Sequence, residues 1–324
     1  MRRVLITGSH GFVGRRFVKH FADCGDEVHC VDNMVSGVPT EDWVHKPDKT
    51  DKLRINFADC RSFLMALQPG AFDLVIHCAA VVGGRLKIEH DTLAVATDLS
   101  IDAEFFNWVV RGKTMPKVIY FSSSAAYGSM YQTRDNPVGA MELYEELIEF
   151  NETIALPDMT YGWAKVSGEY LAKFAAEEYG LDVHVYRPFG GYGDDQSFDY
   201  PFPSIIRRIV NGEDPVMVWG SGDQRRDFIY IDDVVECIIQ SMDAPPGTTL
   251  NIGSGVGTSF RELATRSCEV LNVHRLVRND PDKPEGVFSR VADVTRMARY
   301  YTPRITLEDG IERVAYQIRK INGR

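Results

Sequence analysis

Short apolar runs alternate with longer amphipathic stretches along the N-terminal half of the chain. A short apolar run bounded by turn residues is typical of a buried strand, whereas apolar positions three and four residues apart are typical of a helix. Strands that alternate with helices predict a parallel sheet covered by helices. The predicted strands are residues 4–8, 28–31, 53–57, 72–79, 117–122 and 183–186.

Helical spacing is clearest in three stretches between these strands. The first contains Phe12, Val13, Phe17, Val18 and Phe21 and ends before Gly25, the second covers residues 93–110, and the third runs from about Tyr161 to Tyr179. We expect Gly180 to cap the third helix, because glycine readily adopts the left-handed conformation that ends many helices.

The pattern changes after Pro188, where glycines and aspartates mark a loop and the later elements lose the regular alternation. We therefore predict a first domain at residues 1–188 and a smaller α/β lobe at 189–324, intertwined with the first. The polar segment near 128–160 is predicted to be a flap over the site. Helices in the second lobe are expected from Asp232 to Met242, after the capping box that begins at Ser259, and at Thr306–Ile321.

A glycine-rich turn joins the first strand to the first helix. Gly8, Gly11 and Gly14 form a G-x-x-G-x-x-G pattern, which permits a tight bend and lets the backbone approach a diphosphate at the helix N-terminus. The predicted fold class is thus a Rossmann-type, doubly wound parallel sheet with a smaller C-terminal substrate lobe. We assign Gly8, Gly11, Phe12 and Val13 to cofactor binding.

Three further positions extend this cofactor site. Asp32 ends the second strand, where a carboxylate accepts hydrogen bonds from a ribose diol and repels a 2′-phosphate, which favours NAD over NADP. Asp59 follows the third strand, and its carboxylate either meets the adenine amino group or caps the next helix. Ala79 and Ala80 follow the fourth strand and are small enough for a nicotinamide ribose to lie against the backbone.

Tyr161 and Lys165 lie four residues apart on the third predicted helix, so the two side chains share one face. An ammonium beside a phenol favours the ionised form and lowers its pKa, which makes a proton acceptor usable near neutral pH. Ser123 follows the fifth strand and would reach the same edge of the sheet. With the glycine turn, these residues indicate cofactor-dependent oxidation of an alcohol. The alternative is that Tyr161 and Lys165 are an ordinary pair of exposed side chains on one helix.

Composition narrows the class of protein. The net charge of −10 opposes a nucleic-acid partner, since such binding relies on Lys and Arg at phosphates. Six cysteines form no C-x-x-C pair and sit mostly in apolar runs, which indicates free thiols, no metal site and a reducing compartment. Met1-Arg2-Arg3 leads directly into a strand and no apolar run is long enough to span a membrane, so we expect a cytoplasmic protein.

The motifs together resemble the extended short-chain dehydrogenase/reductases, and within them the NAD-dependent epimerases and dehydratases of nucleotide sugars. The resemblance covers nearly the whole chain, with its motifs in the expected order. These motifs are Thr7-Gly8-Ser9-His10-Gly11-Phe12-Val13-Gly14, His77-Cys78-Ala79-Ala80, Phe121-Ser122-Ser123-Ser124, Tyr161-Gly162-Trp163-Ala164-Lys165 and Arg226-Asp227-Phe228.

The resemblance implies roles for the site residues. Ser123 would hold the sugar 4-hydroxyl, Tyr161 would take its proton during hydride transfer to NAD, and Lys165 would bind the nicotinamide ribose. Gly83, Ser124, Arg226 and Arg290 would contact the substrate. Both arginines resemble residues that grip a nucleotide diphosphate, and a surface salt bridge is the alternative for each. Relatives of this type commonly form homodimers through helices that here lie near 93–110 and 161–178.

Departures from the family pattern restrict the expected chemistry. Ser124-Ala125 stands where 4,6-dehydratases carry an Asp-Glu pair, and Ala125 replaces the cysteine of GDP-fucose synthases and GDP-mannose 3,5-epimerases. Tyr200 stands near a histidine of the fucose synthases, and Gly190 replaces a substrate-binding asparagine.

We expect an NAD-dependent nucleotide-sugar oxidoreductase acting at C4, either a 4-epimerase or a 4-dehydrogenase. A GDP-sugar substrate is a further possibility, because the Gly83-Gly84 loop resembles that of the GDP-sugar enzymes. The alternatives are a 4,6-dehydratase or 3,5-epimerase and, in another class, a catalytically silent dinucleotide-binding sensor or assembly protein.

Overall fold

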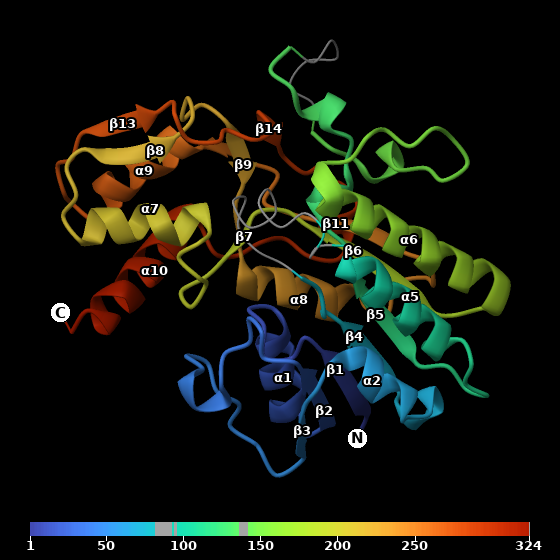
Figure 1. The fold of residues 1–324 in the computed structure, drawn as a ribbon. Helices are drawn as coiled ribbons and strands as arrows, with labels where there is room; N and C mark the ends of the chain where they lie inside the picture. The colour runs from blue at the N-terminus through green and yellow to red at the C-terminus, as the bar shows by residue number, and fades with distance from the viewer. Residues whose placement is uncertain (82–92, 94–95, 136–141, 324) are drawn as a thin grey trace.

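The computed structural model describes residues 1–81, 93, 96–135 and 142–323. Its centre is a seven-stranded parallel sheet in the order β11-β6-β5-β4-β1-β2-β3 (Figure 1). The strands are β1 (Arg3–Thr7), β2 (Glu27–Asp32), β3 (Leu53–Phe57), β4 (Leu74–His77), β5 (Lys117–Phe121), β6 (Val183–Pro188) and β11 (Thr249–Ile252). All six predicted strands are present, and the Rossmann-type fold class is confirmed.

The seventh strand comes from the C-terminal half of the chain. β11 pairs in parallel with β6, with Thr249 opposite Val185 and Ile252 opposite Pro188. The helix before it, α8 (Ile231–Ser241), packs against α1 (Gly14–Asp23). Residues well beyond Pro188 therefore complete the central sheet. The strand pattern of the N-terminal half does not predict this arrangement.

Alternate residues of the strands feed two separate cores, one on each face of the sheet. On one face, Leu5 and Val75 pack with α2 (Cys60–Met65), α5 (Thr97–Val109) and α6 (Met159–Tyr179). On the other face, Val4 and Ile6 pack with α1 and α8. This follows from the two-residue repeat of a strand, which sends neighbouring side chains to opposite faces.

The C-terminal lobe continues the second core beyond the edge of the sheet (Figure 1). Its helices are α7 (Pro201–Val210), α9 (Phe260–Val270) and α10 (Leu307–Ile321), and its small sheets pair β10 (Ile229–Tyr230) with β7 (Gly191–Tyr192), β8 (Val216–Trp219) with β13 (Val277–Asp280), and β9 (Arg225–Asp227) with β12 (Gly257–Ser259) and β14 (Ser289–Arg290). The Ser259 side chain caps α9, as predicted, and the Thr306 side chain caps α10.

Before α6 begins at Met159, the only helical elements among the described residues of the segment near 128–160 are short 3-10 turns. These are Ser129–Gln132 and Glu145–Leu147. A buried group from the sheet holds the second turn: Asn251 donates from its backbone N–H to the Glu145 carboxylate at 2.8 Å and from its side chain to the Leu143 carbonyl at 2.7 Å. This part of the segment is thus fixed to the end of β11.

Two further predictions can be compared with the described residues. All six cysteines lie within them and are free, with only Cys24 exposed. Among these residues, no helix combines the length and apolar character that crossing a bilayer requires. The predicted helix at 93–110 corresponds to α5, and most of its expected first turn lies outside the described residues.

Candidate active site

The turn between β1 and α1 is as tight as its glycines predict. Gly8 has a φ of 66°, and a Cβ there would lie 2.8 Å from the backbone of Cys78 and Ala79. At Gly14 a Cβ would lie 2.1 Å from the Gly8 carbonyl oxygen, so the helix can start against the turn only without a side chain. The backbone N–H groups at the start of α1, around Phe12 and Val13, are thereby presented at the carboxyl edge of the sheet, where a diphosphate fits.

Asp32 lies at the end of β2 beside this turn. Its carboxylate accepts backbone hydrogen bonds from His10 at 2.9 Å and Met34 at 2.8 Å, which fix its position. Asp59 caps α2: it accepts from the Arg61 backbone at 2.9 Å and from its guanidinium, which lowers the pKa of the Asp59 carboxyl. The capping alternative for Asp59 is therefore observed in this structure, and an adenine contact stays a proposal.

Ser123 and Tyr161 meet where β5 ends and α6 begins. The Ser123 side chain caps the short turn Ser124–Ala126 by accepting from the Ala125 backbone at 3.1 Å. α6 approaches this turn at Gly162, where a Cβ would lie 2.3 Å from the Ala125 carbonyl oxygen. Because glycine permits this approach, the preceding Tyr161 lies near Ser123, and the Ser123 hydroxyl lowers the pKa of the Tyr161 phenol.

Lys165 is buried one turn further along α6, with Nζ 5.8 Å from the centre of the Tyr161 ring and 5.5 Å from that of Tyr120. Burial alone would lower the pKa of this ammonium. The negative charges of Asp102 and Asp98, together with Tyr161, outweigh burial and raise it. Lys165 therefore stays protonated at neutral pH and places a fixed positive charge beside Tyr161.

The net direction of the Tyr161 pKa differs from the sequence expectation. Lys165 does lower it, as predicted, but burial has the larger effect and raises the pKa above its ordinary value. Asp98 and Asp102 add to the increase. The i, i+4 spacing predicts the effect of Lys165 on the Tyr161 pKa. It does not predict the free-energy cost of removing a phenolate from water, which raises that pKa.

The two predicted diphosphate arginines are brought together by strand pairing. β14 pairs in parallel with β9 so that Arg290 lies opposite Arg226. Arg226 donates to the backbone carbonyls of Arg225 and Val287 at 2.7 and 2.9 Å. Arg290 donates to the Gln132 side chain and to the Asp158 carboxylate, both at 2.6 Å. The spacing of the two short motifs predicts neither that β14 pairs with β9 nor the register of that pairing.

Other predicted positions have different outcomes. Ser124 is buried in the turn beside Ser123, Ala79 and Ala80 follow β4 next to Gly8, and Gly83 lies outside the described residues. Tyr200 precedes α7, and burial together with Tyr161 raises the pKa of its phenol to about 12. Tyr200 thus lies within electrostatic range of Tyr161, although the two are far apart in sequence.

Sequence reasoning missed the acidic side of this site. Asp98 and Asp102 are both fully or almost fully buried, on the face of α5 that is turned toward α6. Asp102 accepts from the Tyr120 hydroxyl at 2.6 Å and lies 3.2 Å from His77 Nε2. A signal was available: the two acids are four residues apart and share a helix face with Ile101, Phe105 and Val109, where a charge is costly to bury and indicates a specific partner.

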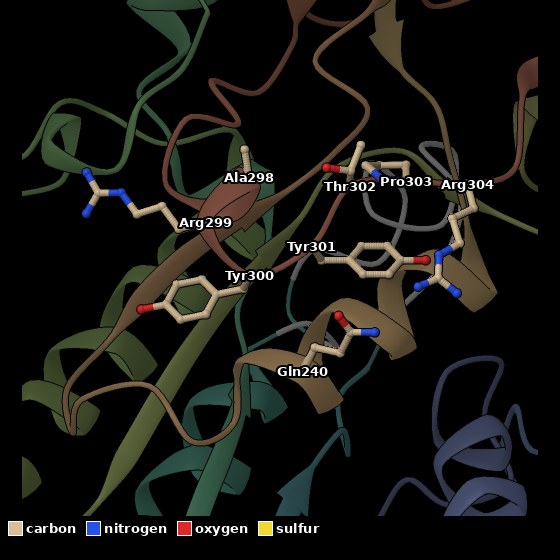
Figure 2. A pocket seen from close by; sticks show the side chains of 8 residues that line it. All are labelled: Gln240, Ala298, Arg299, Tyr300, Tyr301, Thr302, Pro303 and Arg304. Carbon is tan, nitrogen blue, oxygen red and sulfur yellow. The ribbon is translucent and has the colours of Figure 1, made fainter.

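Two surface hollows lie elsewhere. One, of about 370 Å³, is lined by Gln240 of α8 and by residues 298–304, and Figure 2 shows these side chains together. The other, of about 700 Å³, is bordered by α9 and residues 272–277. No predicted site residue lines either hollow. Ser123, Tyr161 and Lys165 lie instead at the carboxyl edge of the sheet.

Comparisons with known proteins show what the chain is similar to. The chain is 28% identical to a dTDP-4-dehydro-6-deoxy-D-allose reductase of Streptomyces bikiniensis, over 97% of this chain and 95% of that protein. It is 35% identical to a putative GDP-L-fucose synthase 2 of Oryza sativa subsp. japonica, over 74% of this chain and 69% of that protein.

In three dimensions the chain is similar to a UDP-glucose 4-epimerase from Thermotoga maritima solved with UDP-glucose. The TM-score is 0.84 at 23% identity, and the match covers 99% of each chain, which shows a shared fold. The model of the NAD dependent epimerase/dehydratase family matches residues 4–253, a span that includes the glycine turn, Ser123, Tyr161 and Lys165. The chain therefore belongs to the NAD-dependent epimerase/dehydratase family, and the family predicted from its motifs is confirmed.

Proposed function

We propose that this protein interconverts a hydroxyl and a ketone at C4 of a nucleotide-activated hexose, with Ser123, Tyr161 and Lys165 as its reactive group. The observation that carries the proposal is the closeness of the Tyr161 phenol to Ser123 and to the buried Lys165 ammonium, at the sheet edge that also holds the glycine turn. Membership of an NAD-dependent family supplies the redox partner. When bound, NAD accepts a hydride, or as NADH returns it.

Each residue has a separate task in this chemistry. Ser123 holds the sugar hydroxyl, and Tyr161 takes its proton as the C4–H bond breaks. Lys165 offsets the charge that develops on the Tyr161 oxygen. Because burial raises the Tyr161 pKa, the phenol is protonated at neutral pH, and this is the form that the reverse reduction of a 4-keto sugar requires.

Charge elsewhere in the site supports a nucleotide-sugar substrate. Arg226 and Arg290 stand side by side on adjacent strands and offer two planar guanidinium groups, which suit a diphosphate. Asp158 and Gln132 orient Arg290 from the N-terminus of α6 and from the 129–132 turn. Asp32, held by two backbone N–H groups, is proposed to accept the adenosine ribose hydroxyls and exclude NADP.

The net reaction is proposed to be redox or epimerisation at C4 alone. Ser124 and Ala125 are both buried in the turn beside Ser123, and neither can serve as the acid–base pair that water elimination requires. Two similar proteins bear the names dTDP-4-dehydro-6-deoxy-D-allose reductase and putative GDP-L-fucose synthase 2, of which the first names a 4-keto substrate. This favours net hydride transfer over epimerisation.

A homodimer through α6 is the proposed assembly. Trp163, Tyr170 and Phe174 are 44%, 51% and 46% exposed and follow one another at intervals of seven and four residues, which places an aromatic stripe along one side of the helix. The six free thiols are compatible with the cytoplasm as its compartment. Sedimentation should give a dimer that Phe174→Glu converts to monomer, and a monomeric wild-type protein would contradict this assembly.

The decisive experiment is incubation with a panel of UDP-, GDP-, CDP- and dTDP-sugars, including their 4-keto forms, with NAD or NADH. Mass spectrometry and NMR of the products should show a change at C4 only: an inverted hydroxyl, a ketone with a loss of two hydrogens, or a reduced ketone. A product that has lost water, or a lack of any change at C4 across the panel, would contradict the proposal.

A further inference from the structure

Asp158 immediately precedes α6 and contacts three parts of the proposed site. Its backbone N–H donates to the Ala125 carbonyl at 3.1 Å, in the turn that follows β5. Its own carbonyl accepts from the Gly162 N–H at 3.1 Å, next to Tyr161 in the first turn of α6. Its carboxylate accepts from the Arg290 guanidinium at 2.6 Å. One residue therefore joins the turn after β5, the helix of Tyr161 and an arginine that is proposed to bind a diphosphate.

The ion pair between Asp158 and Arg290 is largely shielded from water. Both side chains are 14% exposed, and a pair with so little solvent around it is screened less than an exposed one. The Gln132 side chain accepts from Arg290 Nε at 2.6 Å and holds the guanidinium at a second point. A guanidinium carries five N–H donors in a rigid plane, so it can hold a carboxylate and bind a phosphate at once. Arg290 can therefore connect a bound diphosphate to Asp158.

The first turn of α6 depends on contacts from outside the helix. Met159 has a φ of 62°, a left-handed conformation that is unfavourable for a residue with a Cβ. The Thr160 hydroxyl is buried and has no hydrogen-bond partner among the described residues. Strained backbone of this kind persists only where the surrounding structure imposes it. The contact between Asp158 and Arg290 is one of those that decide where this turn lies.

We propose that Asp158 is a positioning residue that links recognition of the diphosphate to the chemistry at C4. A diphosphate bound between Arg226 and Arg290 fixes the Arg290 guanidinium and, through it, Asp158. Asp158 in turn sets the first turn of α6, and with it the place of the Tyr161 phenol. The diphosphate thereby contributes to turnover as well as to affinity, as a remote part of a substrate can. This inference rests on the proposed function for the reaction and for the ligand of the two arginines.

Steady-state kinetics separate this role from one in affinity alone. Asp158→Ala should lower kcat by about tenfold and also raise the KM, because the diphosphate no longer sets the first turn of α6. Arg226→Ala leaves the link through Arg290 intact and should raise the KM alone. Glu152→Ala removes an exposed charge nearby in the sequence and should leave both constants unchanged. An Asp158→Ala enzyme with the kcat of the wild type would overturn the proposal.

A second measurement needs no turnover. The probe is whichever of UDP, GDP, CDP and dTDP binds most tightly in calorimetry, since each carries the diphosphate and lacks the sugar. Carbon NMR of ring-labelled tyrosine, with the Tyr161 signal assigned by its loss in Tyr161→Phe, should show that this nucleotide shifts the Tyr161 signal in the wild type. The shift should be lost in Asp158→Ala at saturating nucleotide. A shift that persists in Asp158→Ala would sink the inference and leave the proposed function intact.

The wild-type protein provides a test that survives misfolding of the variant. The Gly162 amide donates to the Asp158 carbonyl, so its resonance should move when the nucleotide binds. A Gly162 resonance that stays in place at saturating nucleotide, or binding of none of the four nucleotides, would refute the link. A nucleotide-induced shift together with a fully active Tyr161→Phe would contradict the proposed chemistry and leave the link through Asp158 standing.

Discussion

Lys165 and Glu169 lie one turn apart on α6, both are about 3% exposed, and they have opposite surroundings. Glu169 forms a two-point ion pair with Arg187, at 2.6 and 2.9 Å, and also accepts from Ser122. Arg187 in turn donates to the Tyr127 hydroxyl and the Glu145 carbonyl. Lys165 has no ion pair with any described carboxylate and interacts with Asp102, Asp98 and Tyr161 through space.

This comparison indicates that the charge of Glu169 is structural and that the charge of Lys165 is functional. The groups around Glu169 satisfy one another, so this cluster fixes β5, β6 and the 145–147 turn against α6. Near Lys165, Asp98 Oδ2 has no hydrogen-bond partner among the described residues, and we propose that a sugar or a ribose uses the hydrogen-bonding capacity of this region. Removing a charge from the first cluster should therefore affect folding, and removing one from the second should affect chemistry.

Among these variants, Glu169→Ala should produce the largest effect, which is a loss of folding stability. It leaves the Arg187 guanidinium buried without its carboxylate, which should lower the free energy of unfolding by about 3–5 kcal/mol. Urea denaturation followed by circular dichroism measures this. Glu177→Ala, which removes the exposed ion pair with Lys173 on the same helix, should cost only about 0.3–0.5 kcal/mol. Equal losses in the two variants would remove the distinction between buried and exposed pairs.

Tyr161→Phe should reduce turnover by roughly 10²-fold or more, because it removes the proton acceptor and keeps the ring. Stability and NAD binding should change little. Steady-state kinetics with the substrate found in the panel, together with calorimetry of NAD binding, provides the check. Tyr179→Phe, an exposed tyrosine at the other end of the helix, is the matched control. Retention of most of the turnover would refute the role given to Tyr161.

Arg226→Ala should raise the KM for the nucleotide sugar by about tenfold, since each lost charge-assisted hydrogen bond is worth roughly 1.5–3 kcal/mol and part of it is replaced by water. NAD affinity should be unaffected, because the arginine lies on the small sheet of the second lobe. Arg225→Ala is the control: its exposed guanidinium donates to the Gly257 carbonyl. A parallel loss of NAD affinity would indicate a structural role for Arg226 instead.

Lys165→Ala should move the pH dependence of oxidation upward by about one unit. The acceptor form of Tyr161 is the phenolate, so activity rises as the pH passes the phenol pKa; Lys165 lowers that pKa, and its removal raises it. Lys173→Ala on the exposed side of α6 should cause no shift, and a downward shift in Lys165→Ala would contradict the electrostatic role.

Short-range patterns were sufficient for much of this protein. The glycine turn, the acid that ends β2 and the Tyr161–Lys165 spacing all act within one strand–turn–helix unit or one helix, where residue spacing fixes which groups meet. The order of these motifs along the chain predicts both the family and the doubly wound sheet. Gly180, with a φ of 70°, ends α6 where its sequence predicts.

Other features depend on segments that meet only in the folded chain. The place of β11 beside β6 and the pairing of Arg290 with Arg226 each join residues separated by tens of positions. Burial is also a property of the whole fold: it reverses the net direction of the Tyr161 pKa although Lys165 acts as predicted. Sequence determined which reactive groups this protein has, and tertiary structure decided their partners, because both register and desolvation arise from long-range packing.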